Sequence, residues 1–396
     1  MSERSGPREG PWRVSAAGLR TRRAQRLPDR LAAIEGKVAA GERLSRDDGL
    51  TLFEATDLVA VGALADRARQ AKHGRTTWYC ANTHVNYTNC CVNQCPLCAF
   101  WVDPQAEGGY LLTVDEIVDR VGPDVEAGAT EIHIVGGLHP DVGLDYFLEM
   151  VGRLHEAFPE VCLQTLTAVE VAHAAKQSSL AVADVLARLK EAGLSGLPGG
   201  GAEIFDPQVR HRISPNKISG DEWLDVQRQA HGLGIPTNAT MLYGHVESPA
   251  HRVDHLLALR DLQDETGGIA AFIPLSFHPK GTGFEDLPGP TAVDDLKTMA
   301  VARLLLDNVP HVKAFWIMLG PDLAQVALRF GADDIDGTVI REEITHAAGA
   351  RTPERLSIAD LESLVRGAGC EPVERDTLYR RIERGPDLSQ WKRVST

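Results

Sequence analysis

The segment NYTNCCVNQCPLCAFW at residues 86–101 places Cys91, Cys95 and Cys98 in C-x3-C-x2-C spacing. It continues the apolar run TTWYCANTHVN at residues 76–86, whose composition predicts a strand. Thiolate sulfur is the protein ligand of iron–sulfur clusters, and a short loop can wrap three thiolates around one face of a cubane. The spacing therefore predicts a metal-binding loop directly after the first strand of the fold.

The number of cysteines in this loop narrows the kind of metal site. Three protein ligands leave one iron of a 4Fe-4S cluster open, whereas an electron-carrying cluster normally takes four cysteines. A structural zinc site needs four ligands, commonly from two separated pairs, and no second pair follows; His84 is a candidate fourth zinc ligand. Iron–sulfur is the favoured interpretation and zinc is the alternative. The other cysteines are expected to be buried core residues, namely Cys80, Cys90, Cys162 and Cys370.

Downstream of the cysteines, strand-like apolar runs alternate with amphipathic helical stretches. This alternation is typical of parallel β/α units, and seven or eight units fit a (β/α)8 TIM-type barrel of about 250 residues better than an open sheet. In such a barrel the active site lies on the loops at the carboxyl ends of the strands. The predicted later strands are residues 131–137, 161–168, 194–205, 236–244, 269–277, 311–319 and, more weakly, 335–341.

Three flanking segments accompany the predicted barrel at residues 76–350. Residues 27–75 predict a helical prelude, in which Ser45 and Asp48 have the spacing of a capping box. Residues 351–396 predict a C-terminal helical extension with a charged end. Residues 1–26 are rich in arginine, and a disordered solvated extension is favoured over a nucleic-acid-binding arm because no aromatic stacking pattern accompanies the arginines.

Composition limits the partners of the chain. Its 41 basic and 55 acidic residues give a formal net charge of −14, which argues against chain-wide affinity for nucleic acid or anionic lipid. No apolar run approaches the roughly 18 residues of a membrane span, and the N-terminus lacks the apolar stretch of a signal peptide. A cytoplasmic protein without nucleic-acid or membrane partners is expected.

The cysteine loop after the first barrel strand resembles the radical SAM superfamily. Further motifs, in collinear order from about Arg43 to near Tyr379, resemble the group that contains aminofutalosine synthase, dehypoxanthinylfutalosine cyclase and the deazaflavin (FO) synthase subunits. Leu97 and Trp101 depart from the family pattern without removing a ligand. TLTAVEVAH, GGGAEIFDP and GADDIDGT are most similar to aminofutalosine synthase. The other shared motifs are VGGLHPD, NATMLYGHVE and FIPLSFHP.

This resemblance implies a chemistry. The open iron of the 4Fe-4S cluster would bind S-adenosylmethionine, and an electron donor such as flavodoxin or ferredoxin would drive its cleavage to a 5′-deoxyadenosyl radical. The radical would add to 3-[(1-carboxyvinyl)oxy]benzoate, the aryl group would migrate and carbon dioxide would leave. The product would be aminodeoxyfutalosine for menaquinone biosynthesis. The cyclase, an FO synthase subunit and a non-catalytic zinc-binding interaction protein are the alternatives.

Under this resemblance, residues after the later strands are expected to bind S-adenosylmethionine. Gly136 and Gly137 end the second strand, where a glycine pair lets the backbone approach the methionine amine; an ordinary turn is the alternative. Glu170 and Glu203 follow the third and fourth strands, and buried carboxylates are rare without a partner, so they are expected to bind the ribose or the methionine amine. The adenine is expected near Asn238, Tyr243 and Glu247.

The remaining candidates would act on the substrate. His139 follows the glycine pair and is the candidate catalytic residue, with a turn-capping histidine as the alternative. The substrate carries two carboxylates, so an acidic protein must gather cations locally to bind it. The expected substrate-binding residues follow the fourth, fifth, sixth and eighth strands, namely Arg210, Arg212, Lys217, His245, His278 and Arg341.

Overall fold

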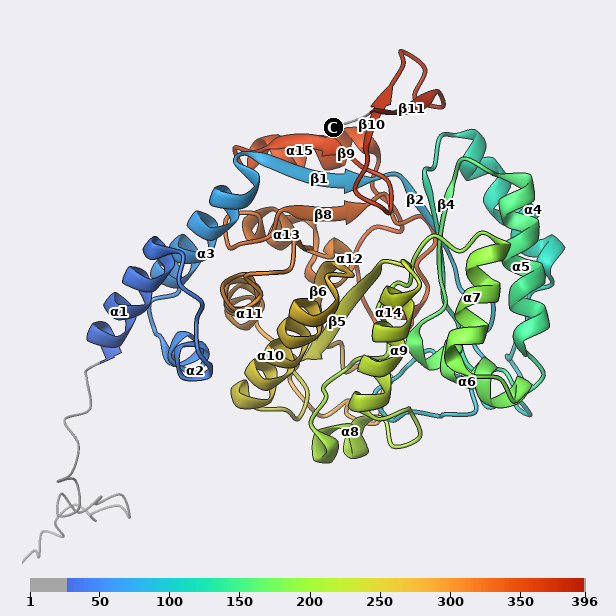
Figure 1. The fold of residues 1–396 in the computed structure, drawn as a ribbon, viewed down its shortest axis with the longest axis horizontal. Coiled ribbons are helices and arrows are strands. Elements are labelled where there is room, and N and C mark those ends of the chain that lie inside the picture. The colour runs from blue at the N-terminus through green and yellow to red at the C-terminus, as the bar shows by residue number, and fades with distance from the viewer. Residues whose placement is uncertain (1–26, 395–396) are drawn as a thin grey trace, which may run out of the picture.

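The computed structural model describes residues 27–394 (Figure 1). These residues form a ring of parallel strands with helices around it. The predicted basic extension at residues 1–26 lies outside the described residues. The predicted first strand is broken at Ala81 into two short strands. The barrel strands are β1 (Thr76–Cys80), β2 (Asn82–Val85), β3 (Glu131–Ile134), β4 (Cys162–Thr165), β5 (Thr237–Tyr243), β6 (Ile269–Ser276), β7 (His311–Val312) and β8 (Asp334–Gly337).

Ladders and single bridges together close the ring. β2, β3 and β4 form one parallel ladder, β5, β6 and β7 form another, and β1 pairs in parallel with β8. Single parallel bridges join these pieces, and residues 196–197 take the fourth place in the ring. The predicted (β/α)8 barrel is therefore confirmed. The joining bridges are Gln164–Gly196, Leu197–Thr237, Lys313–Asp334 and Thr83–Ile340.

Two predicted strands are wrong in extent. The fourth, predicted at residues 194–205, is reduced to Gly196 and Leu197, because Gly199 and Gly201 adopt left-handed backbone that a strand does not allow. The seventh, predicted at residues 311–319, ends at Val312, and a helical turn follows at Trp316–Leu319. The Trp316 indole N–H donates to the Gly337 carbonyl over 2.8 Å, which fixes this turn against β8.

Helices cover the outside of the ring. Many begin with a capping box that is visible in the sequence, as at Thr113 with Glu116 and at Ser219 with Glu222. Of the helices in residues 27–394, none combines the length and apolarity needed to cross a bilayer. The barrel helices are α4 (Val114–Glu126), α5 (Leu144–Ala157), α6 (Ala168–Ser178), α7 (Val182–Ala192), α8 (Pro207–Ile213), α9 (Gly220–Gly232), α10 (Pro249–Thr266), α11 (Ala292–Leu305), α12 (Trp316–Leu319), α13 (Pro321–Ala327) and α14 (Ile344–Ala347).

Three helices precede the barrel in the segment predicted as a helical prelude, and they pack on one side of it. They are α1 (Leu27–Ala40), α2 (Arg46–Glu54) and α3 (Leu58–His73), and α3 lies along α11 (Figure 1). The predicted capping box of Ser45 and Asp48 is present at the start of α2.

The C-terminal segment contains more than the predicted helix. After α15 (Ile358–Gly367), β9 (Glu371–Glu374) pairs in parallel with β1, and β10 (Arg381–Arg384) forms a hairpin with β11 (Trp391–Val394). The sequence analysis does not predict these strands, because their charged residues hide the alternation that marks a strand.

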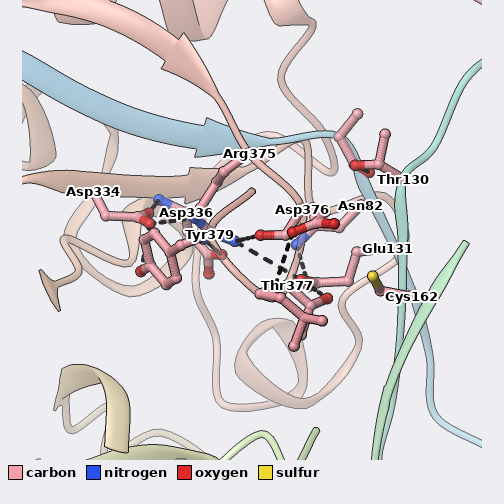
Figure 2. Close-up of polar contacts among 12 residues, drawn as sticks. Asn82, Thr130, Glu131, Cys162, Asp334, Asp336, Arg375, Asp376, Thr377 and Tyr379 are labelled. Atoms are coloured by element: carbon pink, nitrogen blue, oxygen red, sulfur yellow. Dashed lines mark hydrogen bonds and ion pairs between the residues drawn. The ribbon is translucent and has the colours of Figure 1, made fainter. Parts of the chain in front are cut away.

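The turn between β9 and β10 closes the end of the barrel opposite to the strand carboxyl ends (Figure 2). Arg375 is fully buried and donates to Asp334 over 2.6 Å, and the Tyr379 hydroxyl donates to the same carboxylate over 2.8 Å. Thr377 donates to Glu131 of β3 over 2.6 Å. This turn therefore fastens the C-terminal segment to the barrel through charged and hydrogen-bonded pairs, together with the Tyr379 ring, which stacks on His311.

Candidate active site

A cavity of about 310 Å³ lies within the barrel at the carboxyl ends of its strands, the place where this fold carries its chemistry. Its wall combines the cysteine loop with the loops that follow β3, β4 and β8. Apolar side chains contribute much of the remaining lining, including Val135, Leu242, Ile273, Leu275 and Met318.

The three predicted cluster ligands meet at this cavity. Cys91, Cys95 and Cys98 all line it, and none forms a disulfide. The Cys98 backbone N–H donates to the Cys95 carbonyl over 3.0 Å, which makes the tight turn that brings these two side chains together. Cys90 is buried and lies outside the lining, with its sulfur toward Gly109. The loop thus presents three thiols to one space, which is the donor set that a 4Fe-4S cluster with one open iron requires.

Gly137 sits directly beneath the cysteine loop. A Cβ added there would lie 2.2 Å from the Cys90 carbonyl oxygen and 3.0 Å from the Cys91 Cβ, so only glycine allows this approach. Its backbone N–H donates to the Thr88 carbonyl over 2.9 Å. Gly136 and Gly137 both line the cavity, and their predicted contact with a bound cofactor stays a prediction.

Replacing Gly137 by alanine is expected to push the cysteine loop outward, because the contact is with backbone and no side chain can rotate away. Overpacking of this kind costs about 1–3 kcal/mol. The expected result is a reduced iron and sulfide content after reconstitution, measured against Gly152→Ala, where the added Cβ has no neighbour within 4 Å. Equal cluster content in the two variants would contradict the tight packing described here.

Glu170 holds the glycine pair in place. It is buried and lines the cavity, and its carboxylate accepts hydrogen bonds from the Tyr87 hydroxyl over 2.9 Å and from the Gly136 N–H over 3.2 Å. Its other oxygen accepts from the Thr167 N–H at the start of α6. Burial raises the pKa of Glu170, although these donors favour its charged form. Glu170 therefore reaches the predicted site but already has several protein partners there.

Glu203, which is buried, and Lys217, which is partly buried, form an ion pair on the cavity wall. Burial favours the neutral form of Glu203, but Lys217 outweighs it and lowers the pKa of the carboxyl. Glu203 also has left-handed backbone, with φ of 49°, which is uncommon for a residue with a side chain. Arg210 supports this loop from behind by donating to the carbonyls of Ile218, Ala202 and Gly201. Arg210 is thus a structural residue here, and the predicted substrate contact is corrected because its guanidinium is buried among backbone acceptors.

The residues predicted around the adenine do not line the cavity. Asn238 is buried within β5, and Tyr243 donates its hydroxyl to Asp295 over 2.7 Å. β5 contributes Thr240 and Leu242 to the lining instead. Side chains on successive strand residues point to opposite faces, so Tyr243 points away from the inner face that Leu242 occupies. Asn238 shares a face with Thr240 and Leu242, but it lies at the start of β5, whereas the cavity is at the carboxyl ends of the strands.

Glu247 and His245 pair with each other away from the cavity. Glu247 accepts from the Gly244 N–H over 2.7 Å and from Arg252 over 2.8 Å, and His245 Nδ1 lies 2.9 Å from its other oxygen. Burial opposes the charge on Glu247, but His245 and Arg252 hold its pKa well below the ordinary value. These contacts stabilise the loop after β5, and neither residue lines the cavity.

Four other predicted site residues also lie outside the lining. His139 accepts from the Asp141 N–H over 3.1 Å, which is the turn-capping alternative to a catalytic role. Arg212 is exposed, and Arg341 pairs with Asp124 over 2.5 Å at the surface. His278 is within 3.0 Å of the Met318 carbonyl oxygen. The sequence order placed them after strands, but it did not indicate which way each loop turns.

Several polar residues of the cavity were not predicted as site residues. His84 of β2, His133 of β3 and Asp336 of β8 all line it. His84 was considered as a possible zinc ligand and not as a cavity residue. The signal that could have identified all three is their position on inward-facing sites of the strands. Asn86 and Glu342 are further polar residues of the lining.

A second group of metal-ligand side chains lies at the other end of the barrel. His73, His311 and Asp333 place one ligand atom each within 4.8 Å of the others. Asp333 is already an ion-pair partner of Arg303, and its second oxygen lies 2.6 Å from His311 Nδ1. Since a buried guanidinium occupies the carboxylate, this group is a hydrogen-bonded cluster and not a metal site.

Two family models match the chain, the radical SAM superfamily over residues 85–259 and the CofH/MqnC C-terminal region over residues 266–386. Aminodeoxyfutalosine synthase of Thermus thermophilus is 47% identical over 89% of this chain and 96% of its own length. The enzyme of that name from Streptomyces coelicolor is 44% identical over 89% of this chain and 95% of its own length. The 5-amino-6-(D-ribitylamino)uracil–L-tyrosine 4-hydroxyphenyl transferase 1 of Methanosarcina barkeri is 40% identical over 85% of this chain and 90% of its own length.

Among solved structures, methylornithine synthase aligns over 86% of this chain and 97% of its own, with a TM-score of 0.69 and 19% identity, which supports the fold. The barrel, the cysteine loop and these matches define a radical SAM enzyme. The chain belongs to that superfamily and, within it, to the group of the aminodeoxyfutalosine synthases and their CofH/MqnC relatives. Membership implies a 4Fe-4S cluster and S-adenosylmethionine as cofactors.

Proposed function

We propose that this chain is an aminodeoxyfutalosine synthase, which joins the 5′-deoxyadenosyl group to 3-[(1-carboxyvinyl)oxy]benzoate with aryl migration and decarboxylation. The observation that carries the proposal is the identity of 47% and 44% to two enzymes of that name over nearly their whole lengths. The identity to the transferase relative is lower, at 40%.

In this function Cys91, Cys95 and Cys98 would hold the cluster, and Gly136 and Gly137 would border it. When bound, the reduced cluster supplies the electron that cleaves S-adenosylmethionine to methionine and a 5′-deoxyadenosyl radical. Glu170 positions the glycine pair through the Gly136 N–H. At the cysteine end of the cavity, the protein keeps three thiols on one wall and the backbone of Gly137 close to the cysteine loop.

The apolar wall would protect the radical. Val135, Ile273, Leu275 and Met318 line the cavity, and such side chains offer no hydrogen bonds that would retain water next to the reacting carbon. Trp101 also lines it beside the cysteine loop. We infer that the apolar middle of the cavity holds the enolpyruvyl group and that the polar residues at its ends bind the two carboxylates.

Of the residues predicted to bind the substrate, Lys217 lines the cavity. Its positive charge suits a substrate carboxylate. Its pairing with Glu203 keeps it charged, because the carboxylate raises the pKa of the ammonium in spite of burial. Charge on a buried lysine is otherwise disfavoured. The Glu203–Lys217 pair would thus hold a fixed positive group next to the cysteine end of the cavity.

A substrate panel tests the proposal. Reconstituted enzyme, S-adenosylmethionine and dithionite are incubated without oxygen, in separate reactions, with the enolpyruvyl benzoate, with dehypoxanthinylfutalosine, and with tyrosine plus the ribitylaminouracil. Product is expected from the enolpyruvyl benzoate alone, measured by mass spectrometry. Turnover of dehypoxanthinylfutalosine would identify a cyclase, and turnover of the third pair would identify an FO synthase subunit; either result would overturn the proposal.

A further inference from the structure

The GADDIDGT motif at residues 331–338 holds three buried aspartates with different surroundings, and Figure 2 shows two of them, Asp334 and Asp336. Asp333 pairs with Arg303 and lies 2.6 Å from His311 Nδ1. Asp334 accepts from Arg375 over 2.6 Å and from the Tyr379 hydroxyl over 2.8 Å. Both carboxylates therefore stabilise the barrel and have their hydrogen-bonding capacity filled.

Asp336 differs from the other two because it lines the cavity and its carboxylate has two long ion pairs instead of hydrogen bonds. It is 6% exposed, and within residues 27–394 no group donates a hydrogen bond to its carboxylate. Its nearest cations, Lys313 Nζ and Arg375 Nη2, lie 3.7 and 4.0 Å from Oδ1, beyond hydrogen-bond length. Its backbone is left-handed, with φ of 70°. Buried groups without partners and strained backbone both persist mainly where function requires them.

Two histidines face the same part of the cavity. His84 of β2 and His133 of β3 are partners in the parallel ladder, and their rings stack with centroids 4.4 Å apart and planes 11° from parallel. Both line the cavity. Burial lowers the pKa of each ring, so both imidazoles are neutral and each retains one N–H donor. The barrel strands thus hold two neutral donors and one carboxyl at this end of the cavity.

We propose that Asp336, together with His84 and His133, is the recognition site for an aryl carboxylate, with the Asp336 carboxyl sharing one proton with the carboxylate of the ligand. This deepens the proposed function and rests on it, because it assigns this site to the ring carboxylate of the enolpyruvyl benzoate. The imidazole N–H groups would donate to the same carboxylate. The enolpyruvyl end would then point toward the cysteine loop at the other end of the cavity.

The charges around Asp336 are compatible with a shared proton. The groups that face it are Lys313 beyond β7, Asp334 on its own strand, Glu131 on β3 and Arg375 beyond β9. Two of these charges are positive and two are negative, and burial raises the pKa of Asp336. Two carboxyl groups in close contact cannot both be ionised, so one proton between them is the stable arrangement.

Two substitutions of Asp336 separate this role from a structural one. Glycine adopts the left-handed backbone without strain, so Asp336→Gly removes the carboxyl alone. Asparagine also tolerates this backbone, and Asp336→Asn keeps an N–H donor for a carboxylate while it loses the titratable proton. Asp119→Asn on the exposed face of α4 is the control.

The test measures binding without turnover. Reconstituted protein with S-adenosylmethionine and no reductant is titrated with 3-methoxybenzoate, which has the ring carboxylate but no enolpyruvyl group, and with its carboxamide. We expect wild type to prefer the acid, Asp336→Gly to bind it about tenfold or more weakly, and Asp336→Asn to bind it within about threefold of wild type. Asp119→Asn should behave like wild type.

The outcomes distinguish this inference from the proposed function. Equal binding by wild type and Asp336→Gly, equal losses in the glycine and asparagine variants, or no binding of 3-methoxybenzoate to wild type would overturn the recognition site. Binding that depends on Asp336, together with no product from the enolpyruvyl benzoate, would support the recognition site and overturn the proposed function instead.

Discussion

Cys95→Ser is expected to lose the iron–sulfur cluster and with it all cleavage of S-adenosylmethionine. Cys95 is buried on the cavity wall between the other two cysteines of the loop. A serine hydroxyl at this position is a poor iron ligand at neutral pH, because it stays protonated where a thiol can ionise. Iron and sulfide content and the rate of S-adenosylmethionine consumption should fall to the level of protein without iron.

Cys90→Ser is the matched control for this experiment. Cys90 adjoins Cys91, but it lies outside the cavity lining and its sulfur packs toward Gly109. The variant should keep its cluster content and its cleavage rate near those of wild type. Cluster loss in Cys90→Ser with retention in Cys95→Ser would show that the ligand set is assigned to the wrong sulfurs.

Arg375→Met is expected to give the largest loss of stability. Arg375 is fully buried and pairs with Asp334, and methionine would leave that carboxylate buried without its counter-charge. Breaking a buried ion pair from one side costs about 3–5 kcal/mol, even where the intact pair adds little net stability. The loss should appear as a lower urea midpoint and as early proteolysis of the C-terminal segment that Arg375 fastens to the barrel.

Arg366→Ala is the control for Arg375→Met. Arg366 pairs with Glu362 along α15, and its side chain is 61% exposed. Exposed pairs of this kind contribute about 0.3–0.5 kcal/mol. If both variants unfolded at the same urea concentration, the buried network at the closed end of the barrel would not hold the C-terminal segment.

The parts of the fold that were predictable are those with a local signal. The capping box of Ser45 and Asp48 and the apolar runs of the barrel strands can be read directly from the sequence. The extent of the fourth strand was predicted wrongly. Its place in the ring depends on single bridges at Gly196 and Leu197, and no local sequence pattern indicates such bridges. β9 likewise forms because β1 offers an open edge, and not because its own residues favour a strand.

The site was predictable where chemistry alone selects the residue. Cys91, Cys95 and Cys98 line the cavity, since three thiols at this spacing have few other uses. A position directly after a strand was a weaker indication that a residue belongs to the site. Arg210 and Glu247 both have such positions, but they form hydrogen bonds with nearby backbone groups instead of lining the cavity. Asp336 was missed because its carboxylate lines the cavity with long ion pairs and accepts no hydrogen bond within residues 27–394, which appears only in three dimensions.

The fate of the adenosyl group tests the central claim most directly. Reconstituted enzyme is given dithionite, the enolpyruvyl benzoate and S-adenosylmethionine with a ¹³C-labelled ribose. The proposed function predicts that the label enters the decarboxylated product, with one S-adenosylmethionine consumed for each product formed. Label recovered only as free 5′-deoxyadenosine, with the enolpyruvyl benzoate unchanged, would contradict it.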